Sequence, residues 1–368
     1  MKNITLNELH LIHELSNRDY VNNSMAYNSS LREREEFKAI KKKLKAIAEG
    51  YKNKYNDEFG SFTTSASSGN PIKFNKAKLN RVWSGIFKGA NNKQYAAQIS
   101  FVVDEKNKAL DIGFFFGRAA SRGKSPDLNR LLYLGNGLSN AIKENPLFKQ
   151  QYDNLIDFGF KSTTNQGEID SELWLDHIQV NPQNSQLVYK LYANTNGIIE
   201  IETITLYVNM LMFLMTLIPS DENDIIITKK FYLTPEQRAK QTERKALIGL
   251  KGEEFILQQE ILRLQKLNIN HHKYLHHSSL ISDHFGFDIQ SCDDDYSVLY
   301  IEVKTTTRKK NNYKANEFHL SSNEYNFYLD NMSKYKLLRV YDIEGKPEFE
   351  EVDLGSATLY IDSYKIEI

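Results

Sequence analysis

The heptapeptide VLYIEVK, residues 298–304, decides how the second half of this chain folds. Its aliphatic residues alternate with tyrosine, glutamate and lysine, and this period of two predicts a β-strand whose aliphatic face lies in a core. The same alternation places Glu302 and Lys304 next to each other on the opposite face. An acid and a lysine at this spacing can form a simple ion pair, so the heptapeptide alone does not indicate a function.

Two earlier segments each add a carboxylate. Residues 249–267 have the apolar spacing of an amphipathic helix, and Glu253 falls inside its apolar stripe. A carboxylate there is costly unless it is paired, hydrogen-bonded or bound to a metal, although one at the margin of the stripe can also reach solvent or an arginine. The tetrapeptide GFDI, residues 286–289, predicts a strand in which Asp288 projects to the face opposite its two apolar neighbours.

A helix glutamate, a strand aspartate and a strand Glu-x-Lys together suit phosphodiester hydrolysis, which uses divalent cations held by carboxylates. Asp288 and Glu302 would supply the carboxylates and Val303 a backbone carbonyl. This oxygen donor set suits Mg²⁺, with Mn²⁺ as a substitute. Lys304 would stabilise negative charge at the phosphate. It would serve as a general base if the metal lowers its pKa, and the residues alone leave both roles open.

This arrangement resembles the PD-(D/E)xK nuclease superfamily over residues 245–354, and more closely the nuclease domains at the C-termini of restriction and phage-defence proteins. The segments that carry the resemblance are Gly252-Glu253, Gly286-Phe-Asp-Ile289, Tyr300-Ile-Glu-Val-Lys-Thr305 and Phe318-His-Leu-Ser-Ser-Asn-Glu324. The resemblance implies an α/β restriction-endonuclease-like core, with a mixed central sheet flanked by helices. It also implies a catalytic trio of Asp288, Glu302 and Lys304, assisted by Glu253.

The segment directly after the Glu-x-Lys strand contains Thr305, Thr306, Arg308 and Lys309. Their hydroxyls and cations suit contact with DNA phosphates, and they suit an ordinary polar loop equally well. Further along, residues 318–324 predict a strand leading into a helix, in which the glutamate has a capping role.

Five histidines precede or adjoin the aspartate strand, between residues 271 and 284. Their spacing matches no metal-binding pattern, so they are interpreted as loop residues, with His277 as the candidate neighbour of the metal site. The acidic triplet at residues 293–295 predicts a hairpin turn rather than a calcium loop.

Residues 1–220 predict an α+β domain. Helices are expected at residues 6–15, 32–55 and 128–143, a β-hairpin or two adjacent strands within residues 95–117, further strand at residues 173–192 and a buried helix up to residue 218. Residues 221–244 are interpreted as a linker that contains a helix start at Pro235. Residues 245–368 form the predicted nuclease domain, whose final strand is residues 357–368.

Patches of the N-terminal domain resemble the DNA-binding domain of McrB-type modification-dependent restriction proteins. The matching segments are Ser65-Ala-Ser-Ser-Gly69, Val82-Trp-Ser-Gly-Ile-Phe87, Tyr95-Ala-Ala-Gln-Ile-Ser100 and Gly113-Phe-Phe-Phe-Gly-Arg118. Most aromatic side chains here are expected in the core, and any that line a pocket would suit stacking on an extruded base. Arg118, Arg122 and Lys124 form a cationic loop that suits phosphate binding, although a solvated loop is equally ordinary.

The overall composition limits the partners. Lys and Arg number 47, as do Asp and Glu, so the net charge is zero and any nucleic-acid surface has to be local. One cysteine excludes a disulfide framework. The longest apolar run, residues 204–218, contains polar residues and is too short for a membrane span. The protein is therefore expected in the cytoplasm, without a membrane partner.

These observations predict a magnesium-dependent DNA endonuclease of restriction or phage defence, with residues 1–220 reading DNA sequence or base modification. Double-strand cleavage needs two active sites, so a homodimer or a transient dimer on DNA is expected, and a methyltransferase or an ATPase encoded alongside would be a compatible partner. Two alternatives stay open. One is a DNA-binding module that needs a partner for cleavage, and the other is a nuclease for RNA or single strands, because metal-assisted hydrolysis does not itself distinguish the 2′-OH.

Overall fold

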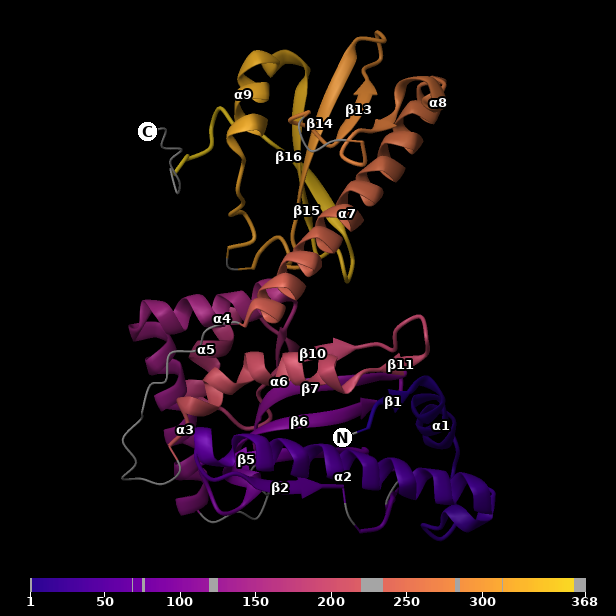
Figure 1. The fold of residues 1–368 in the computed structure, drawn as a ribbon, viewed down its shortest axis with the longest axis vertical. Coiled ribbons are helices and arrows are strands. Elements are labelled where there is room, and N and C mark those ends of the chain that lie inside the picture. Colours follow the sequence, from indigo (N-terminus) through magenta and orange to yellow (C-terminus); the bar gives the residue numbers. More distant parts are fainter. Residues whose placement is uncertain are drawn as a thin grey trace. The chain divides into compact units, whose positions relative to one another are not determined.

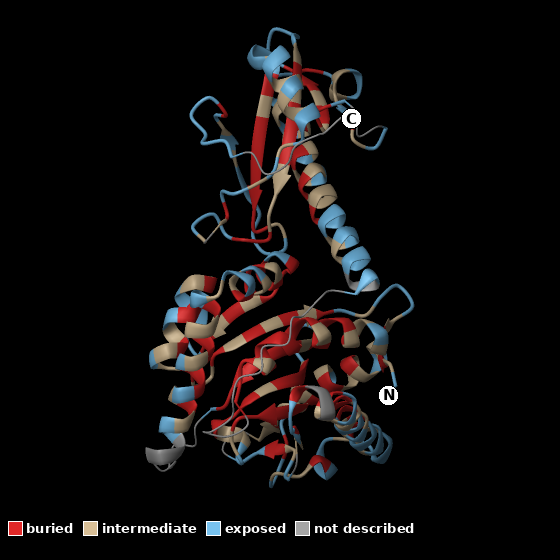
Figure 2. Cartoon of the chain, turned by 60° about the vertical axis from the view of Figure 1, so that its left-hand side comes forward, coloured by how far each residue is buried: buried red, intermediate tan, exposed pale blue. Residues whose placement is uncertain are grey.

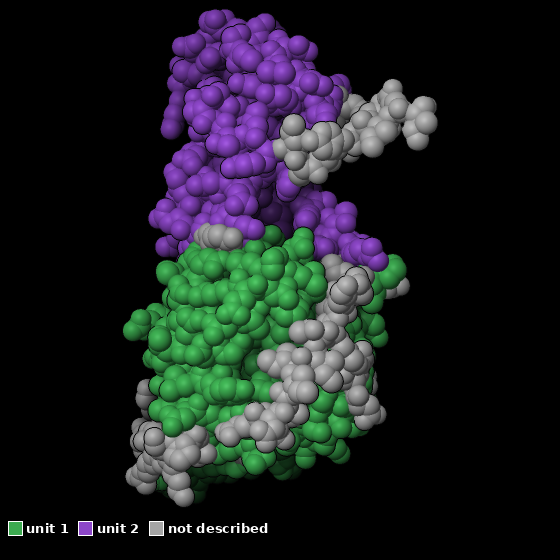
Figure 3. Space-filling view, turned by 90° about the vertical axis from the view of Figure 1, so that its left-hand side faces the viewer, with its two compact units in different colours: residues 1–237 green, residues 238–368 purple. Residues whose placement is uncertain are grey.

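The computed structural model describes residues 2–67, 69–74, 77–118, 125–219, 234–281, 285–312 and 314–360. The chain folds into two compact units, unit 1 (residues 1–237) and unit 2 (residues 238–368), which Figure 3 shows in different colours. Each unit has its own main β-sheet together with helices. The mixed α and β class predicted from the sequence is therefore confirmed.

Unit 1 is built on a seven-stranded sheet in which every neighbouring pair is antiparallel. Across the sheet the strands are β2 (Thr63–Ala66), β5 (Trp83–Lys88), β6 (Ala97–Asp104), β7 (Ala109–Phe116), β10 (Gln186–Leu191), β8 (Lys161–Thr164) and β9 (Gly167–Glu168). Two short ribbons pair β1 (Ile4–Thr5) with β11 (Ile198–Ile199) and β3 (Ile72–Lys73) with β4 (Lys78–Leu79). The helices are α1 (Leu6–Ser16), α2 (Leu31–Phe59), α3 (Ser125–Glu144), α4 (Pro146–Phe158), α5 (Ser171–Val180) and α6 (Ile201–Thr216).

Helices α2 and α6 cover one face of this sheet (Figure 1). Tyr51 of α2 stacks on Phe101 of β6 with ring centroids 5.4 Å apart, and Tyr207 of α6 stacks on Tyr189 of β10 at 4.3 Å. Lys88 also reaches this buried side, where its ammonium group donates to a backbone oxygen at the end of α2 at 2.9 Å. Because side chains alternate along a strand, the intervening residues point to the other face of the sheet.

Several elements of unit 1 follow the sequence prediction. Strands β6 and β7 form the expected hairpin, α3 includes residues 128–143, and α6 is the expected buried helix. The prediction of continuous strand over residues 173–192 is wrong, because its first part is helix α5. The carboxylate of Asp170 caps that helix by accepting from the backbone N–H of Glu172 at 2.8 Å, and one apolar face of α5 is buried.

Unit 2 contains a mixed five-stranded sheet in the order β12 (His276–His277), β13 (Ile289–Cys292), β14 (Val298–Thr305), β15 (Tyr335–Tyr341) and β16 (Glu348–Val352). Strands β14 and β15 are parallel and the other neighbours are antiparallel. The helices are α7 (Pro235–Lys266), the short α8 (His271–Tyr274) and α9 (Ser322–Asp330). The expected alternation of residues 298–304 is confirmed, since Ile301 and Val303 pack with Ile256 of α7, whereas Tyr300 packs with Phe327 of α9.

Helix α7 begins at Pro235, as the sequence predicts, and residues up to 244 are therefore helical rather than an extended linker. Residues 221–233 of the predicted linker lie outside the described residues. The first part of α7 is largely exposed, as the blue segment in Figure 2 shows, and burial begins near Ile248. No helix in the described part of the chain is long and apolar enough to cross a membrane.

The predictions near the C-terminus are partly wrong. Residues 318–320 are not a strand, although the helix after them is confirmed, with Ser321 and Glu324 forming a capping box. Residues 357–360 also form no strand, and residues 361–368 lie outside the described residues. The edge of the sheet is instead β16, whose acidic residues pair with basic ones on or near the sheet.

Gly252 allows α7 to approach the end of β14 very closely. A Cβ atom at this position would lie 1.8 Å from Oγ1 of Thr305 and 2.8 Å from its Cβ, well inside van der Waals contact. Glycine costs a helix interior about 1 kcal/mol relative to alanine. Close packing of the helix on the strand offsets that cost, and it brings Glu253, the next residue, against the sheet.

We expect Gly252→Ala to lower the free energy of unfolding by about 1–3 kcal/mol, because the added methyl group overlaps Thr305. Gly249→Ala, in the same helix, is the matched control. Its Cβ would meet nothing closer than 3.9 Å, so it should stabilise the protein by up to about 1 kcal/mol. Urea unfolding followed by circular dichroism measures both, and equal effects of the two substitutions would contradict the close contact.

Candidate active site

Lys304 lies among carboxylates on the α9 side of the unit 2 sheet. Its ammonium nitrogen is 2.8 Å from Oε1 of Glu302, on the same strand face, and 2.8 Å from Oε2 of Glu324 at the start of α9. The Glu302 side chain is 3% exposed, and that of Lys304 is 18% exposed. The strand alternation therefore brings Glu302 and Lys304 together as predicted, and the tertiary fold adds Glu324.

Asp288 joins this group from the residue directly before β13. Its Oδ2 accepts a hydrogen bond from the backbone N–H of Val303 at 2.8 Å. Its own backbone N–H donates to the carbonyl of Ile301 at 2.9 Å. These two bonds hold Asp288 against the strand that carries Glu302 and Lys304.

The prediction that Asp288 faces away from two neighbours on a shared face is wrong. Strand β13 begins only at Ile289, and the chain bends at Asp288. Phe287 packs on Tyr300 on the α9 side, with ring centroids 4.7 Å apart, whereas Ile289 packs with Ile256 on the α7 side. Asp288 therefore lies where the chain passes from one layer to the other.

Glu253 approaches Asp288 from helix α7. Its Oε2 is 2.8 Å from Nε2 of His277 and accepts from the hydroxyl of Ser279 at 2.5 Å. The side chains of Glu253 and His277 are 15% and 11% exposed. His277, the histidine predicted to be a neighbour of the site, thus contacts Glu253, whereas His284 lies outside the described residues.

Burial raises the pKa of both central carboxyl groups. For Glu302, burial and then the charge of Asp288 raise the pKa to about 8. For Asp288, burial and then the charge of Glu253 raise the pKa to about 7. Two buried carboxyl groups so near each other do not ionise independently, so they titrate as a pair. Near neutral pH the pair therefore holds protons more tightly than ordinary carboxyl groups do, and a nearby cation would favour its ionised forms.

Lys304 is an ammonium ion in this arrangement. Burial alone would lower its pKa, but the carboxylates of Glu302 and Glu324 outweigh that effect and raise the pKa above its usual value. The hydroxyl of Tyr335 is buried near the same carboxylates and has no hydrogen-bond partner among the described residues. Burial, and then the charges of Glu302 and Glu324, raise the pKa of Tyr335, so its hydroxyl stays protonated.

The residues present suit a hard divalent cation. Asp288 and Glu302 offer carboxylate oxygens, and Val303 lies between Glu302 and Lys304 with a backbone carbonyl. The described part of the chain contains no ready-made cluster of three or more His, Cys, Asp or Glu side chains around one point. Mg²⁺ needs no such cluster, because it commonly keeps several waters and binds through one or two carboxylates.

One family model matches this part of the chain. Residues 252–352 match the family described as "Protein NO VEIN, C-terminal". The matched residues begin at Gly252 and end with β16, so they include Glu253, Asp288, Glu302, Lys304 and Glu324. Neither the curated proteins nor the solved structures contain a match to the chain. The match to the NO VEIN C-terminal family therefore covers the whole candidate site and does not include unit 1.

Four residues at and after the end of β14 were candidates for phosphate contact, and the structure separates them. Arg308 is 3% exposed, so it is not available at the surface. Thr305 is half-buried and packs on Gly252, and the hydroxyl of Thr306 accepts from the backbone N–H of Arg308 at 3.2 Å. Lys309 is exposed. Of the candidates in unit 1, Arg118 is exposed, whereas Arg122 and Lys124 lie outside the described residues.

Sequence reasoning missed three members of the site: Ser279, Glu324 as a partner of Lys304, and Tyr335. The sequence signal of Glu324 was its position three residues after Ser321, which correctly indicated a helix cap. That signal does not reveal that the same carboxylate also reaches Lys304. Tyr335 lies opposite Tyr300 across a parallel strand pair, a register that the sequence does not specify.

We expect Asp288→Asn to stabilise the metal-free protein at pH 8. The raised pKa means that folded Asp288 holds its proton more tightly than the unfolded chain does, so stability falls as the pH rises from about 4 to above 7. Removing the charge should raise the free energy of unfolding by about 1–4 kcal/mol at pH 8, and this gain should become smaller toward pH 4. Thermal unfolding in EDTA at several pH values measures it. Asp294→Asn, in the exposed hairpin turn, is the control, and a pH-independent gain for Asp288→Asn would contradict the repulsion.

Proposed function

We propose that this chain is a metal-dependent DNA endonuclease, with Asp288, Glu302 and Lys304 as its catalytic residues and Glu253 as an auxiliary. The observation that carries the proposal is the largely buried Lys304 ammonium ion between Glu302 and Glu324, beside Asp288. An ordinary ion pair on a strand lies at the surface and joins one cation to one carboxylate. Here the carboxyl groups of Glu302, Glu324 and Asp288 lie around one largely buried ammonium group, and a further cation would favour the ionised forms of Glu302 and Asp288.

The protein residues have distinct tasks in this proposal. Asp288, Glu302 and the carbonyl of Val303 would hold Mg²⁺ or Mn²⁺, which supplies Lewis acidity and activates a water molecule when bound. Lys304 would bind a phosphate oxygen and stabilise the charge that develops there. Glu324 would position the Lys304 ammonium group, and the protonated Tyr335 hydroxyl would donate a hydrogen bond within the site. His277 and Ser279 would orient Glu253.

The proposal extends to the fold and the biological setting. The mixed sheet, with the Glu-x-Lys strand β14 at its centre and helices α7 and α9 on its two faces, supports a restriction-endonuclease-like core. Unit 1 would read DNA sequence or base modification, in a cytoplasmic restriction or phage-defence enzyme. Two copies would act together on duplex DNA, since each strand needs an active site, and a methyltransferase or ATPase encoded alongside would suit this role.

A plasmid cleavage assay with Mg²⁺ or Mn²⁺ tests the proposal. Lys304→Ala and Asp288→Ala should each reduce cleavage by about 100-fold or more, because each removes a group that contacts the metal or the reacting phosphate. Asp294→Ala removes a carboxylate from the exposed hairpin turn of the same unit and should cleave like the wild type. Retained DNA binding by Lys304→Ala would show that the loss is catalytic.

The choice of substrates distinguishes the alternatives. Unmodified, methylated and phage DNA with modified bases should be compared with RNA and single-stranded DNA. Binding without cleavage of every substrate would favour a DNA-binding module, and cleavage confined to RNA or single strands would replace duplex DNA as the substrate. Cleavage that survives in Asp288→Ala would exclude the proposed site.

A further inference from the structure

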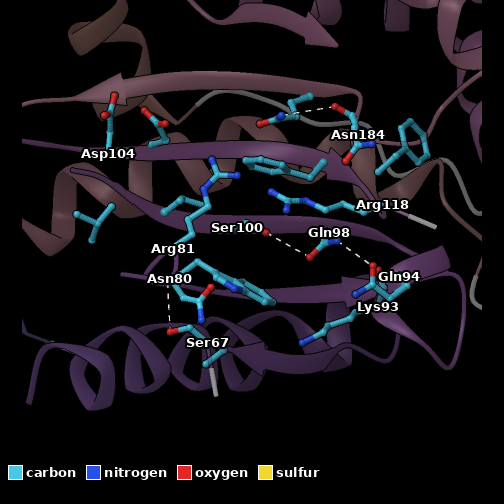
Figure 4. A pocket seen from close by; sticks show the side chains of 18 of the residues that line it. Ser67, Asn80, Arg81, Lys93, Gln94, Gln98, Ser100, Asp104, Arg118 and Asn184 are labelled. Carbon is cyan, nitrogen blue, oxygen red and sulfur yellow. Dashed lines mark hydrogen bonds between the residues drawn. The ribbon is translucent and has the colours of Figure 1, made fainter. Parts of the chain in front are cut away.

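A pocket of about 810 Å³ opens on the face of the unit 1 sheet opposite α2 and α6 (Figure 4). Alternate residues of β5, β6, β7 and β10 form its floor, and residues near β3 and β4 form part of its rim. Pockets that hold small organic ligands have volumes of roughly 300–1,000 Å³. The size of this pocket therefore permits a ligand as large as a nucleotide.

The strand register explains why the sheet is hollow here. Gly85, Ser100 and Gly113 lie opposite one another on β5, β6 and β7, so the middle row of the floor has almost no side-chain volume. The row on one side of it contains Trp83 and the row on the other contains Phe115, and both line the pocket. The result is a trough with an aromatic side chain on each side.

Two guanidinium groups supply positive charge at the pocket. Arg81 and Arg118 point toward each other in Figure 4, and neither makes a hydrogen bond or ion pair with the described residues. Burial, and then the charge of Arg118, lower the pKa of Arg81. The carboxylates of Asp111, Glu105 and Asp104 act on Arg81 without forming an ion pair with it, so an anion between the two guanidinium groups would be favourable. A phosphate suits this position, since arginine binds phosphate oxygens in a bidentate fashion.

Three carboxylates, Asp104, Glu105 and Asp111, also line the pocket, and their charges act on Arg81. The basic residues Lys73, Arg81, Lys93 and Arg118 of the same lining outnumber them. Lys190 is 2.8 Å from Oδ1 of Asp111 and also pairs with Asp104, so one cation serves both carboxylates. Lys93, at the other side of the trough, lies over the Trp83 ring at 4.7 Å and donates to the hydroxyl of Ser65 at 2.7 Å. These contacts hold the indole ring in place at the edge of the trough.

We propose that this pocket binds one nucleotide, with its phosphate between Arg81 and Arg118 and its base in the trough between Trp83 and Phe115. Both aromatic side chains offer stacking surface to a base of any identity. Gln98 and Gln186 line the same pocket and supply amide groups for the edge of the base. The ligand chemistry is a phosphate ester that carries a planar base, found in a free nucleoside monophosphate and in each nucleotide of a DNA strand.

This inference deepens the DNA-reading role proposed for unit 1, yet it can fail while the nuclease proposal holds. The pocket residues belong to unit 1 and the catalytic residues to unit 2. Binding is therefore measured on the full chain in EDTA, where metal-dependent cleavage does not occur. Cleavage by the same variants is measured separately with Mg²⁺.

Tryptophan fluorescence provides a local signal. The chain has two tryptophans, and Trp174 is fully buried in the core, so quenching by a ligand reports on Trp83. The probes are deoxycytidine and deoxyadenosine monophosphates and a single-stranded oligonucleotide of about ten nucleotides. Wild-type protein should be quenched by at least one of these probes, and Trp83→Phe should remove the signal.

Affinity is measured in parallel by anisotropy of a labelled oligonucleotide and by competition with the monophosphates. Arg81→Gln and Arg118→Gln should each weaken binding about tenfold or more, since each removes a charged hydrogen-bond donor. Ser100→Leu should also weaken it by filling the trough. Arg32→Gln is the matched control, because its side chain is 87% exposed on α2, which covers the opposite face of the sheet.

Each outcome has a defined meaning. Quenching and competition by the monophosphates would identify the single nucleotide as sufficient, whereas an effect of the oligonucleotide alone would identify a nucleotide within a strand as the ligand. Either result, combined with loss in the three pocket variants, supports the proposal. Absence of quenching by every probe, or affinity that is equal in Arg81→Gln, Ser100→Leu and Arg32→Gln, would overturn it.

Discussion

The repulsion among buried carboxylates around Lys304 is the constraint on which unit 2 depends. Glu302, Asp288 and Glu324 come from three different segments, and the fold holds them near one ammonium ion. Burying a charge without a partner in a protein core costs a large amount of folding free energy. A sheet with a helix on each face can bear that cost, because the surrounding apolar clusters of α7 and α9 stabilise the strands that carry the charges.

Two glycines allow helices α7 and α9 to pack closely on the strands and loops that carry the site. Gly252 brings α7 onto Thr305, as described above. Gly286 has a φ of +77°, and a Cβ there would lie 2.7 Å from Cβ of Phe327 in α9. Only glycine combines this backbone conformation with such close packing. The glycines beside Glu253 and Asp288 are thus explained by packing, and the packing in turn determines where the two carboxylates lie.

Unit 1 has a sheet of its own, and the two faces of that sheet differ in composition. Helices α2 and α6 bury one face almost completely, while the other face keeps glutamines, a serine and two glycines in its central rows. A polar second face is ordinary for an antiparallel sheet, but the row of small residues that hollows this one leaves part of the face without side-chain packing. The polar, hollow face of unit 1 and the crowded acidic site of unit 2 are therefore both places where the chain gives up stability, which is typical of functional sites.

The sequence by itself determined the elements whose pattern is local. The alternation of residues 298–304, the buried helix α6, the β6–β7 hairpin and the start of α7 all follow from spacing and caps, because periodicity and capping act over a few residues. It also identified Asp288, Glu302, Lys304 and Glu253 as candidates. It failed over residues 173–192, where the short apolar pattern of α5 does not distinguish a strand from a helix.

Only the tertiary structure decided which of these side chains meet. The bend at Asp288, the contact of Glu324 with Lys304 and the partnership of Glu253 with His277 join residues between 15 and 24 positions apart, and no local pattern specifies such distances. The trough in unit 1 arises from a register across three strands, where Gly85, Ser100 and Gly113 happen to align. Periodicity shows which face a residue takes, whereas strand register and helix packing, which depend on the whole core, determine its neighbours.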